Sequence, residues 1–377
     1  MKRRISPAPL KQWSEILTII SGKNQKNVKS DTGQYPIYGS GGIIGYATEY
    51  LCEAGTTIVG RKGTIDKPIF VNERFWNVDT AFGISPSDVL DAKYLYYFCR
   101  QFNFKKLDKS TTIPSLAKRD LLQIKMPVPS IMEQRRIVSR IEELFSKLDK
   151  GVETLQTIKQ QLAVYRQAVY SSNFNKIGDF RPIVDFFEIS GGLTKNSKRQ
   201  ELPQQVPYLR VANVYYNCLE LDVIKTIGVT EKELQKCSLK TSDLLFVEGN
   251  GSKSQIGRVA MWDGSIETCV HQNHLIRGRA NGKILPKYAL YYLISQEGRK
   301  QIVDIAKSTS GLYTLSINKV KNLQIPFCSR PEQETILNEI EARLSVCDSI
   351  EQTVDEALAQ ADAMRQSILK QAFEGEI

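Results

Sequence analysis

One short stretch of the chain gathers most of the side chains that could bind a metal ion. Residues 269–274 read Cys-Val-His-Gln-Asn-His, which places a thiol and both histidines of the protein within six residues. Thiolate and imidazole are the usual zinc ligands, but a structural zinc site normally takes four of them. No second cluster supplies the remaining ligands, so the sequence predicts no metal site. These polar groups are instead expected to face solvent or a bound partner.

The residues that could catalyse a reaction lack the spacing that catalysis needs. Asp91-Ala-Lys93, with Asp88 nearby, resembles the end of a nuclease carboxylate-lysine motif. Metal-dependent nucleases hold their ions between separated carboxylates, and this spacing is too tight. The stretch is better interpreted as the start of a helix capped by Ser87 or Asp88. No two prolines are adjacent, so the chain also lacks the Pro-Pro-Tyr or Pro-Pro-Phe motif of amino-methyltransferases. We therefore predict no catalytic residue.

Glycine-rich loops offer a different chemistry, which is close approach to phosphates. The Gly39–Gly45 and Gly249–Ser254 stretches lack the spacings of the mononucleotide and dinucleotide fingerprints. Basic and amide side chains beside such loops can reach the phosphates and base edges of a nucleic acid, although ordinary tight turns remain the alternative. The candidate DNA contacts are Tyr38, Ser40, Arg61, Lys62, Thr64, Thr111 and Thr112 in the first half of the chain, and Arg210, Asn213, Asn250, Ser252, Lys253, His271, Asn273, Ser310 and Tyr313 in the second.

The composition agrees with a nucleic-acid partner. Among 377 residues, 51 Lys and Arg oppose 41 Asp and Glu, which gives a net charge of +10. Such an excess favours phosphate-bearing partners. The seven cysteines are scattered without a C-x-x-C pair, which indicates reduced thiols rather than a disulfide framework. No segment approaches the roughly 20 apolar residues of a membrane span, and we expect a cytoplasmic protein.

An internal repeat organises the chain. Glu133-Gln134 and Glu332-Gln333 begin two stretches that match without a gap at an offset of 199 residues. Upstream, Leu-Gln-Ile at 122–124 matches Leu-Gln-Ile at 323–325. The repeat predicts a globular domain over 1–130, a long helix over 131–174, a second globular domain over 175–330 and a second long helix over 331–377.

Both repeated stretches show the 4 and 3 spacing of apolar residues that is typical of a coiled coil. Gly151 interrupts the first seam and Arg343 the second. Each helix is expected to run about 35–40 residues, or about 55–60 Å. The predicted seam consists of Ile137, Ile141, Leu144, Leu148, Leu155, Ile158 and Leu162 in the first helix, and Ile336, Ile340, Ile350, Val354, Met364 and Ile368 in the second.

These observations predict an α+β protein in which two globular mixed α/β domains are separated by two long helices. Two copies of one helix, each following a globular domain, imply a pseudo-two-fold tandem repeat with the helices paired as an antiparallel coiled coil. The alternative is that two unrelated long helices each pack on their own domain.

At this point the chain resembles the specificity subunits of Type I restriction-modification enzymes. The resemblance rests on two motifs at the helix starts, Pro129–Gln134 and Pro331–Gln333. It rests also on three sequence stretches in the globular regions, Tyr38–Gly45, Pro207–Asn213 and Gly249–Arg258. It implies two target-recognition domains that each bind one half of a bipartite double-stranded DNA sequence. It also implies that the helix pair fixes the gap between the halves and docks two methyltransferase subunits, which two motor-endonuclease subunits can join. S-adenosylmethionine, ATP and magnesium would then belong to those partners, and this chain would be a non-catalytic subunit without a cofactor.

A coiled-coil adaptor that joins proteins without binding a DNA sequence is the alternative function. Such an adaptor accounts for the two long helices. It leaves the duplicated regions with basic, glycine-rich loops unexplained.

Overall fold

The computed structural model describes residues 8–250, 252–306 and 313–377. The chain divides into two compact units, Met1–Gln156 with Asp355–Ile377 and Thr157–Val354. Each unit contains one globular region and one segment of each of the two longest helices, α4 (Ile131–Phe174) and α9 (Arg330–Glu374). None of the described helices is long and apolar enough to cross a membrane.

The globular region of the first unit is built on a four-stranded sheet with the order β2-β8-β5-β6, in which all neighbours are antiparallel. A three-stranded sheet, β4-β3-β7, combines one antiparallel and one parallel pairing. The elements are β1 (Leu10–Gln12), α1 (Trp13–Ile16), β2 (Leu17–Ser21), β3 (Tyr35–Gly39), β4 (Gly42–Ala47), β5 (Thr56–Gly60), β6 (Ile69–Val71), β7 (Trp76–Asn77), β8 (Ala81–Pro86), α2 (Ala92–Gln101), α3 (Lys118–Leu121) and β9 (Lys125–Pro127).

The second unit repeats this topology. Its four-stranded sheet has the order β11-β20-β16-β18, again fully antiparallel, and its three-stranded sheet is β15-β12-β19 with one parallel pairing. The elements are β10 (Phe180–Pro182), β11 (Phe187–Gly191), β12 (Gln205–Leu209), β13 (Val214–Tyr215), β14 (Cys218–Leu219), β15 (Lys225–Gly228), α5 (Glu231–Cys237), β16 (Leu244–Val247), β17 (Gly249–Asn250), β18 (Val259–Met261), β19 (Val270–His271), β20 (Leu275–Ala280), α6 (Pro286–Ile294), α7 (Gln296–Ala306), β21 (Tyr313–Thr314), α8 (Ile317–Lys321) and β22 (Gln324–Pro326).

Local sequence explains the principal elements. Every residue of β5 and of β16 is buried, as expected for central strands covered on both faces. Helix α2 begins at Asp91, whose side chain accepts hydrogen bonds from the backbone N–H groups of Lys93 and Tyr94. The expected caps, Ser87 and Asp88, therefore lie too early in the sequence. Helix α5 begins with a capping box between Thr230 and Glu233.

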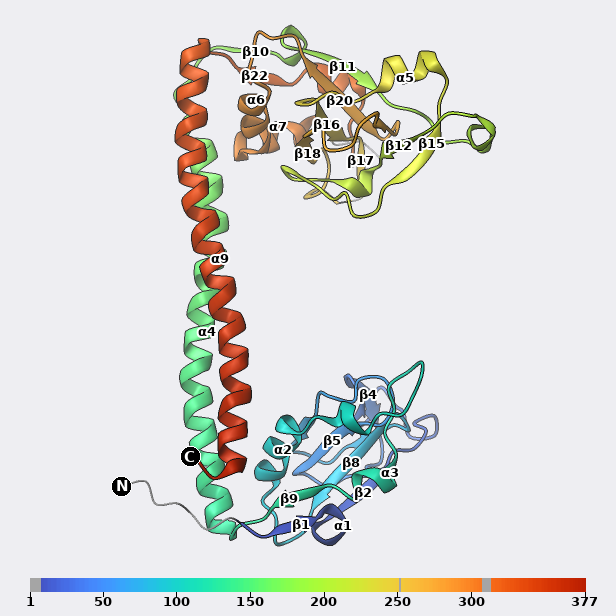
Figure 1. The fold of residues 1–377 in the computed structure, drawn as a ribbon, viewed down its shortest axis with the longest axis vertical. Helices are drawn as coiled ribbons and strands as arrows, with labels where there is room; N and C mark the ends of the chain where they lie inside the picture. The colour runs from blue at the N-terminus through green and yellow to red at the C-terminus, as the bar shows by residue number, and fades with distance from the viewer. Residues whose placement is uncertain (1–7, 251, 307–312) are drawn as a thin grey trace. The chain divides into compact units, whose positions relative to one another are not determined.

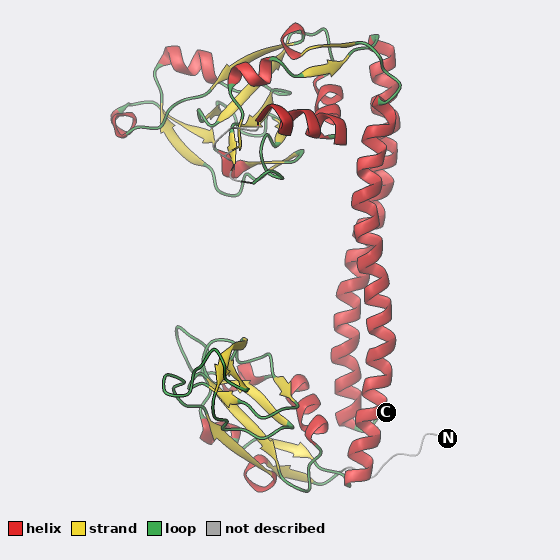
Figure 2. Ribbon diagram, turned by 180° about the vertical axis from the view of Figure 1, so that it is seen from behind, coloured by secondary structure: helices red, strands yellow, loops and turns green. Residues whose placement is uncertain are grey.

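A short helix joins each globular region to the long helices. In each unit the sheets lie on one side of α2 or α6, and the other side faces the helix pair (Figure 2). Lys93 Nζ on α2 lies 2.6 Å from Glu142 Oε1 on α4, and Lys287 Nζ on α6 lies 2.6 Å from Glu341 Oε1 on α9. The two glutamates are separated by the repeat offset, so equivalent contacts hold both globular regions.

The two long helices pack side by side with opposite chain directions within each unit (Figure 1). In the first unit, Ile137 and Ile141 of α4 share a core with Leu369 and Ala372 of α9. In the second unit, Val169 and Phe174 of α4 share a core with Ile340 and Leu344 of α9. At 44 and 45 residues, the helices are longer than the length of about 35–40 residues expected from their apolar pattern.

The seam of the coiled coil differs from the prediction at two positions. Ile350 and Met364 are 40% and 53% exposed, so their assignment to the seam is wrong. The buried positions of α9 run instead through Leu344, Cys347 and Val354, with Glu351 and Arg365 half-buried. The remaining predicted seam residues of both helices are buried or half-buried.

The repeat upstream of the long helices has a different register from the one expected. Ile124 O accepts a hydrogen bond from Trp13 N (2.9 Å), and Leu323 O accepts the equivalent bond from Ile183 N (2.7 Å). Ile124 is therefore equivalent to Leu323, at the same offset of 199. Matching the two Leu-Gln-Ile triplets to each other was wrong by two residues.

Candidate nucleic-acid interface

In the first unit, three loops meet at one end of the four-stranded sheet. Strand β5 ends at Gly60, where a Cβ would collide with the carbonyl oxygen of Thr64 and lie 3.1 Å from Cβ of Ser40. Gly63 N donates to Pro114 O at 2.9 Å, and Leu116 N donates to Arg61 O at 2.9 Å. The fold thus brings the 38–42, 60–64 and 110–116 segments together, although they are far apart in the sequence.

Most of the residues predicted to bind DNA in this unit lie on these loops. Arg61, Lys62, Thr111 and Thr112 are exposed, while Ser40 and Thr64 are half-buried. Tyr38 is half-buried and packs edge-to-face on Phe75, with ring centroids 5.4 Å apart. Burial raises the pKa of the Tyr38 phenol, with a smaller contribution from Glu73. Tyr38 therefore stays neutral and serves partly as a core residue.

Asp108 positions the loop that carries Thr111 and Thr112 (the threonine loop), a role that was not predicted from the sequence. Its Oδ1 accepts hydrogen bonds from Ser110 N (3.0 Å), Ser110 Oγ (2.6 Å) and Ser115 N (3.1 Å). These bonds from Ser110 and Ser115 lower the pKa of the Asp108 carboxyl. An aspartate two residues before a serine is a signal for an Asx turn, which would have identified it.

In the second unit, the segment 252–258 forms the equivalent loop after β16. Ser252 and Lys253 are exposed on it. Two side chains outside the loop bind its backbone. The Tyr216 hydroxyl donates to Ser254 O. The Arg299 guanidinium donates to Ile256 O (2.7 Å) and Gly257 O (2.9 Å). The Arg299 guanidinium also stacks on the Tyr216 ring at 4.9 Å. Neither of these two residues was predicted, since they lie outside the loop in sequence.

Two residues predicted to contact DNA are buried and already engaged within the protein. His271 is fully buried, and its Nδ1 lies 3.2 Å from Cys237 O, so Nδ1 carries the proton. Asn213 is 2% exposed; its Nδ2 donates to Glu220 O (2.7 Å) and its Oδ1 accepts from Arg210 N (3.0 Å). This burial contradicts the expectation that either side chain contacts DNA.

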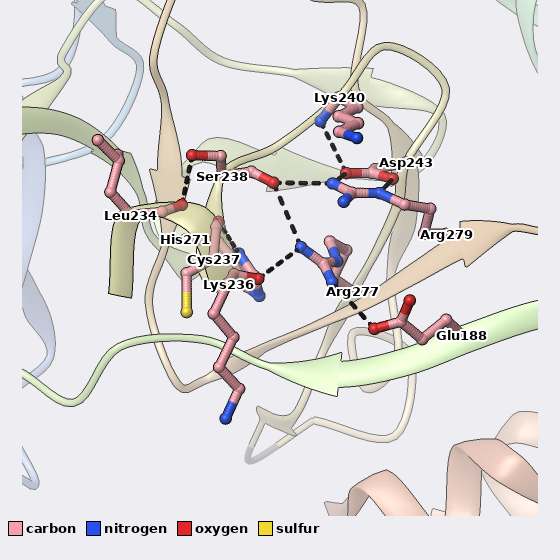
Figure 3. Close-up of polar contacts among 10 residues, drawn as sticks. All are labelled: Glu188, Leu234, Lys236, Cys237, Ser238, Lys240, Asp243, His271, Arg277 and Arg279. Atoms are coloured by element: carbon pink, nitrogen blue, oxygen red, sulfur yellow. Dashed lines mark hydrogen bonds and ion pairs between the residues drawn. The ribbon is translucent and has the colours of Figure 1, made fainter. Parts of the chain in front are cut away.

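His271 belongs to a buried polar cluster that fastens the end of α5 (Figure 3). Arg277, 2% exposed, donates to Lys236 O (3.0 Å) and Ser238 O (3.2 Å), and Arg279 forms an ion pair with Asp243 at 2.6 Å. Burial lowers the pKa of His271 to about 4, and the charge of Arg277 contributes. The imidazole is therefore neutral at physiological pH.

The remaining predicted contacts of the second unit are partly accessible or not described. Arg210, Asn273 and Tyr313 are half-buried, and the Arg210 guanidinium donates to Val223 O at 3.0 Å. Ser310 and the side chain of Asn250 lie outside the described residues. Within residues 8–250, 252–306 and 313–377, no group of three or more His, Cys, Asp or Glu side chains is arranged to hold a metal ion.

Each of the two repeats matches one known protein family. The family described as "Type I restriction modification DNA specificity domain" matches residues 10–163 and 178–360. The chain belongs to this family. It is a Type I restriction enzyme specificity subunit, and the protein-joining adaptor considered above is not favoured.

Individual relatives agree with this assignment. The chain is 27% identical over 318 residues to the Type I restriction enzyme EcoKI specificity subunit of Escherichia coli K12, covering 78% of this chain and 67% of that protein. It is 23% identical over 395 residues to the EcoDI specificity subunit of Escherichia coli, covering 97% and 88%. Among solved structures, the fold resembles a chain of a type I R-M system (TM-score 0.73, 14% identity, 100% of both chains). It also resembles the HsdS subunit of Thermoanaerobacter tengcongensis (TM-score 0.55, 14% identity, 99% and 98%).

Proposed function

We propose that this specificity subunit binds a bipartite double-stranded DNA target, with each globular region reading one half. Both regions have the same sheet topology, and in both a polar loop follows the central strand, β5 or β16. Loop side chains supply hydrogen bonds to base edges, and lysines and arginines supply the salt-dependent attraction to phosphates. The proposed contacts are the exposed or half-buried residues of the loops described above.

The helix pair acts as the spacer between the two reading regions. The observation that carries this proposal is a reciprocal pair of ion pairs between α4 and α9. Arg166 pairs with Asp348 at 2.7 Å in the second unit, and Arg365 pairs with Asp149 in the first. Each residue of one pair is the repeat equivalent of a residue in the other pair. A fixed antiparallel register of this kind makes the half-site spacing a property of helix length.

Catalysis is assigned to partner subunits. The specificity subunit would bring two methyltransferase subunits to the two half-sites, and two motor-endonuclease subunits would join them. S-adenosylmethionine, ATP and magnesium would bind to those partners, and the complex would act in the cytoplasm, where the host DNA lies. One structurally similar chain belongs to a type I R-M system whose complex assembly has been described.

Methylation mapping followed by a gel shift tests this proposal. Single-molecule sequencing of cells with and without this gene, in the presence of the methyltransferase gene, gives the target. The purified chain with its methyltransferase subunits should then retard a duplex that contains both halves. It should bind duplexes with either half scrambled much more weakly. Equal binding to all duplexes would contradict the proposed function.

A further inference from the structure

A basic cavity lies beside the loops of the first unit that carry the proposed DNA contacts, which are residues 38–42, 60–64 and 110–116. Its volume is about 480 Å³, and it lies between the end of β2, the turn after β5 and the start of α3. It is lined by Ser21, Arg61, Lys62, Phe82, Ser115, Leu116, Ala117, Lys118 and Arg119. Four cations and two hydroxyl groups therefore face one space, and none of the lining residues is a carboxylate.

Within the described chain, the positive charge of this cavity is not balanced. Arg61, Lys62 and Lys118 form no ion pair with any carboxylate among the described residues. Arg119 Nε lies 3.6 Å from Asp120 Oδ1, but Asp120 also pairs with Lys109 at 3.0 Å. Cations brought together without counter-charges repel one another, and a bound anion would remove that cost.

Two of the cations are held in place by backbone groups. Arg61 Nη1 donates to Asp79 O at 3.2 Å, and its guanidinium lies over the Phe82 ring at 5.9 Å. Lys118 Nζ donates to Ile19 O at 2.7 Å. A carbonyl oxygen orients a cation without neutralising its charge, so both side chains remain available to an anion with part of their ordering entropy already lost.

The fold itself does not require these cations, because the equivalent described positions of the second unit do not carry them. Leu116 N donates to Arg61 O in the first unit, and Leu315 N donates to Glu248 O (2.6 Å) in the second. Arg61 is therefore equivalent to Glu248. Counting onward from the two leucines, Lys118 and Arg119 are equivalent to Ile317 and Asn318.

We propose that this cavity binds one phosphodiester group of the DNA backbone, next to the half-site read by the first unit. The inference rests on the proposed function and adds a site whose arginine at position 61 is replaced by Glu248 in the second unit. A phosphate held by Arg61, Lys62 and Lys118 would fix the position of the duplex relative to the adjacent threonine loop. Backbone contacts of this kind set the register in which base edges are read.

Neutral phosphate analogues test the site directly. The complex with methyltransferase subunits is titrated with mapped target duplexes, each carrying one methylphosphonate at a different backbone position. Wild type should bind about tenfold more weakly when one particular phosphate beside the first half-site is neutralised. In the Lys62→Gln variant, a methylphosphonate at that position should weaken binding little further. The steepness of the plot of log binding constant against log salt concentration should fall by roughly 0.9.

The choice of variants separates binding from folding. The backbone N–H of Lys62 donates to Thr80 O, but its side chain has no hydrogen-bond or ion-pair partner within the described residues. Lys62→Gln therefore removes a charge without breaking a side-chain contact. Lys125→Gln removes an exposed charge from β9 of the same unit and should leave the sensitive phosphate sensitive.

Each other outcome overturns the proposal in a distinguishable way. If the wild-type complex binds its target but no single methylphosphonate beside that half-site matters, the cavity is not a DNA phosphate site and the proposed function stands. Inorganic phosphate is also added as a competitor of DNA binding. If it competes in the wild type but not in Lys62→Gln, while Lys62→Gln keeps its sensitivity to methylphosphonate at every backbone position, the site binds an anion unrelated to DNA. If the wild-type complex does not select the mapped target, the proposed function fails as well.

Discussion

Arg166 Nη2 lies 2.7 Å from Asp348 Oδ1, and the residues 199 positions away, Arg365 and Asp149, form the same ion pair. An arginine on α4 meets an aspartate on α9 in one unit, and the helices exchange roles in the other. Such reciprocity is expected when two copies of one helix pair with each other in opposite directions. The same pattern appears at the helix starts, where Gln134 and Gln333 make equivalent bonds.

Charge reversal tests the importance of the ion pairs for the helix register. Arg166→Glu should destabilise the second unit by about 1 kcal/mol, because a half-buried arginine that bridges Asp348 and Glu351 becomes a repelling carboxylate. Combining it with Asp348→Arg should recover part of that loss in urea unfolding. As a control, Arg140→Glu, which breaks only an exposed pair within α4, should have a smaller effect. A double variant no more stable than Arg166→Glu would show that the pair does not set the register.

Each long helix is fastened to its globular region by a buried glutamine near its first turn. Gln134 Oε1 accepts from Asp91 N (2.7 Å), while its Nε2 donates to Val89 O (3.0 Å) and Pro129 O (2.9 Å). Gln134→Ala should cost about 3 kcal/mol, because it leaves buried backbone groups without partners. Gln333, whose side chain bonds Leu285 N and Cys328 O, should give a similar loss. Gln160→Ala, at an exposed position of α4, is the control.

Acid should selectively weaken the second unit through His271. Its pKa is about 4 in the folded protein, because burial and the nearby Arg277 disfavour the charged form. An unfolded histidine titrates near 6.5, so the unfolded chain binds the proton more readily. The stability from the neutral imidazole is complete above about pH 6.5 and is lost as the pH falls towards 4, by up to about 1.4 kcal/mol per pH unit.

Unfolding curves at several pH values check this expectation. His271→Asn should abolish that part of the slope; asparagine suits the site because Asn77 is buried at the equivalent strand position of the first unit. His274→Asn should retain the slope, because it leaves His271 in place. Identical pH slopes for wild type and His271→Asn would contradict the assignment.

The two reading regions should act independently. Replacing Thr111 and Thr112 by alanine should relax recognition of one half-site only, by about 1 kcal/mol for each hydrogen bond lost to a base edge. Lys253→Ala should weaken binding at the other half-site, and Arg61→Ala at the first. Methylation mapping in cells that carry each variant gives the result. Loss of selectivity at both half-sites from one variant would show that the regions do not read separately.

The helices and the repeat could be predicted from the sequence because their signals are periodic. The exact seam could not, since Arg343 and Leu344 are neighbours and only packing selects Leu344 as the buried residue. The match of the Leu-Gln-Ile triplets failed because three residues carry little information about register, whereas backbone hydrogen bonds fix it.

The candidate site was predictable only in part. Arg61 and Lys62 lie on an exposed, glycine-bounded turn, and such turns can be identified from composition. His271 and Asn213 also lie in polar stretches, yet their side chains satisfy buried backbone groups, which only the folded chain reveals. Lys118 and Arg119 were missed because more than 50 residues separate them from Arg61, and the fold alone brings them to one cavity.

The most direct test of the spacer lengthens both helices together. Seven residues of helical, heptad-matched sequence are inserted after Leu155 and after Val354, which are equivalent positions in the repeat. A heptad preserves the seam and adds about 10 Å to each helix, or about three base pairs of duplex. The methylated sequences of cells that express this variant are then mapped. We expect both half-sites to be unchanged and the gap between them to be longer; an unchanged gap would contradict the account of the helix pair as the spacer.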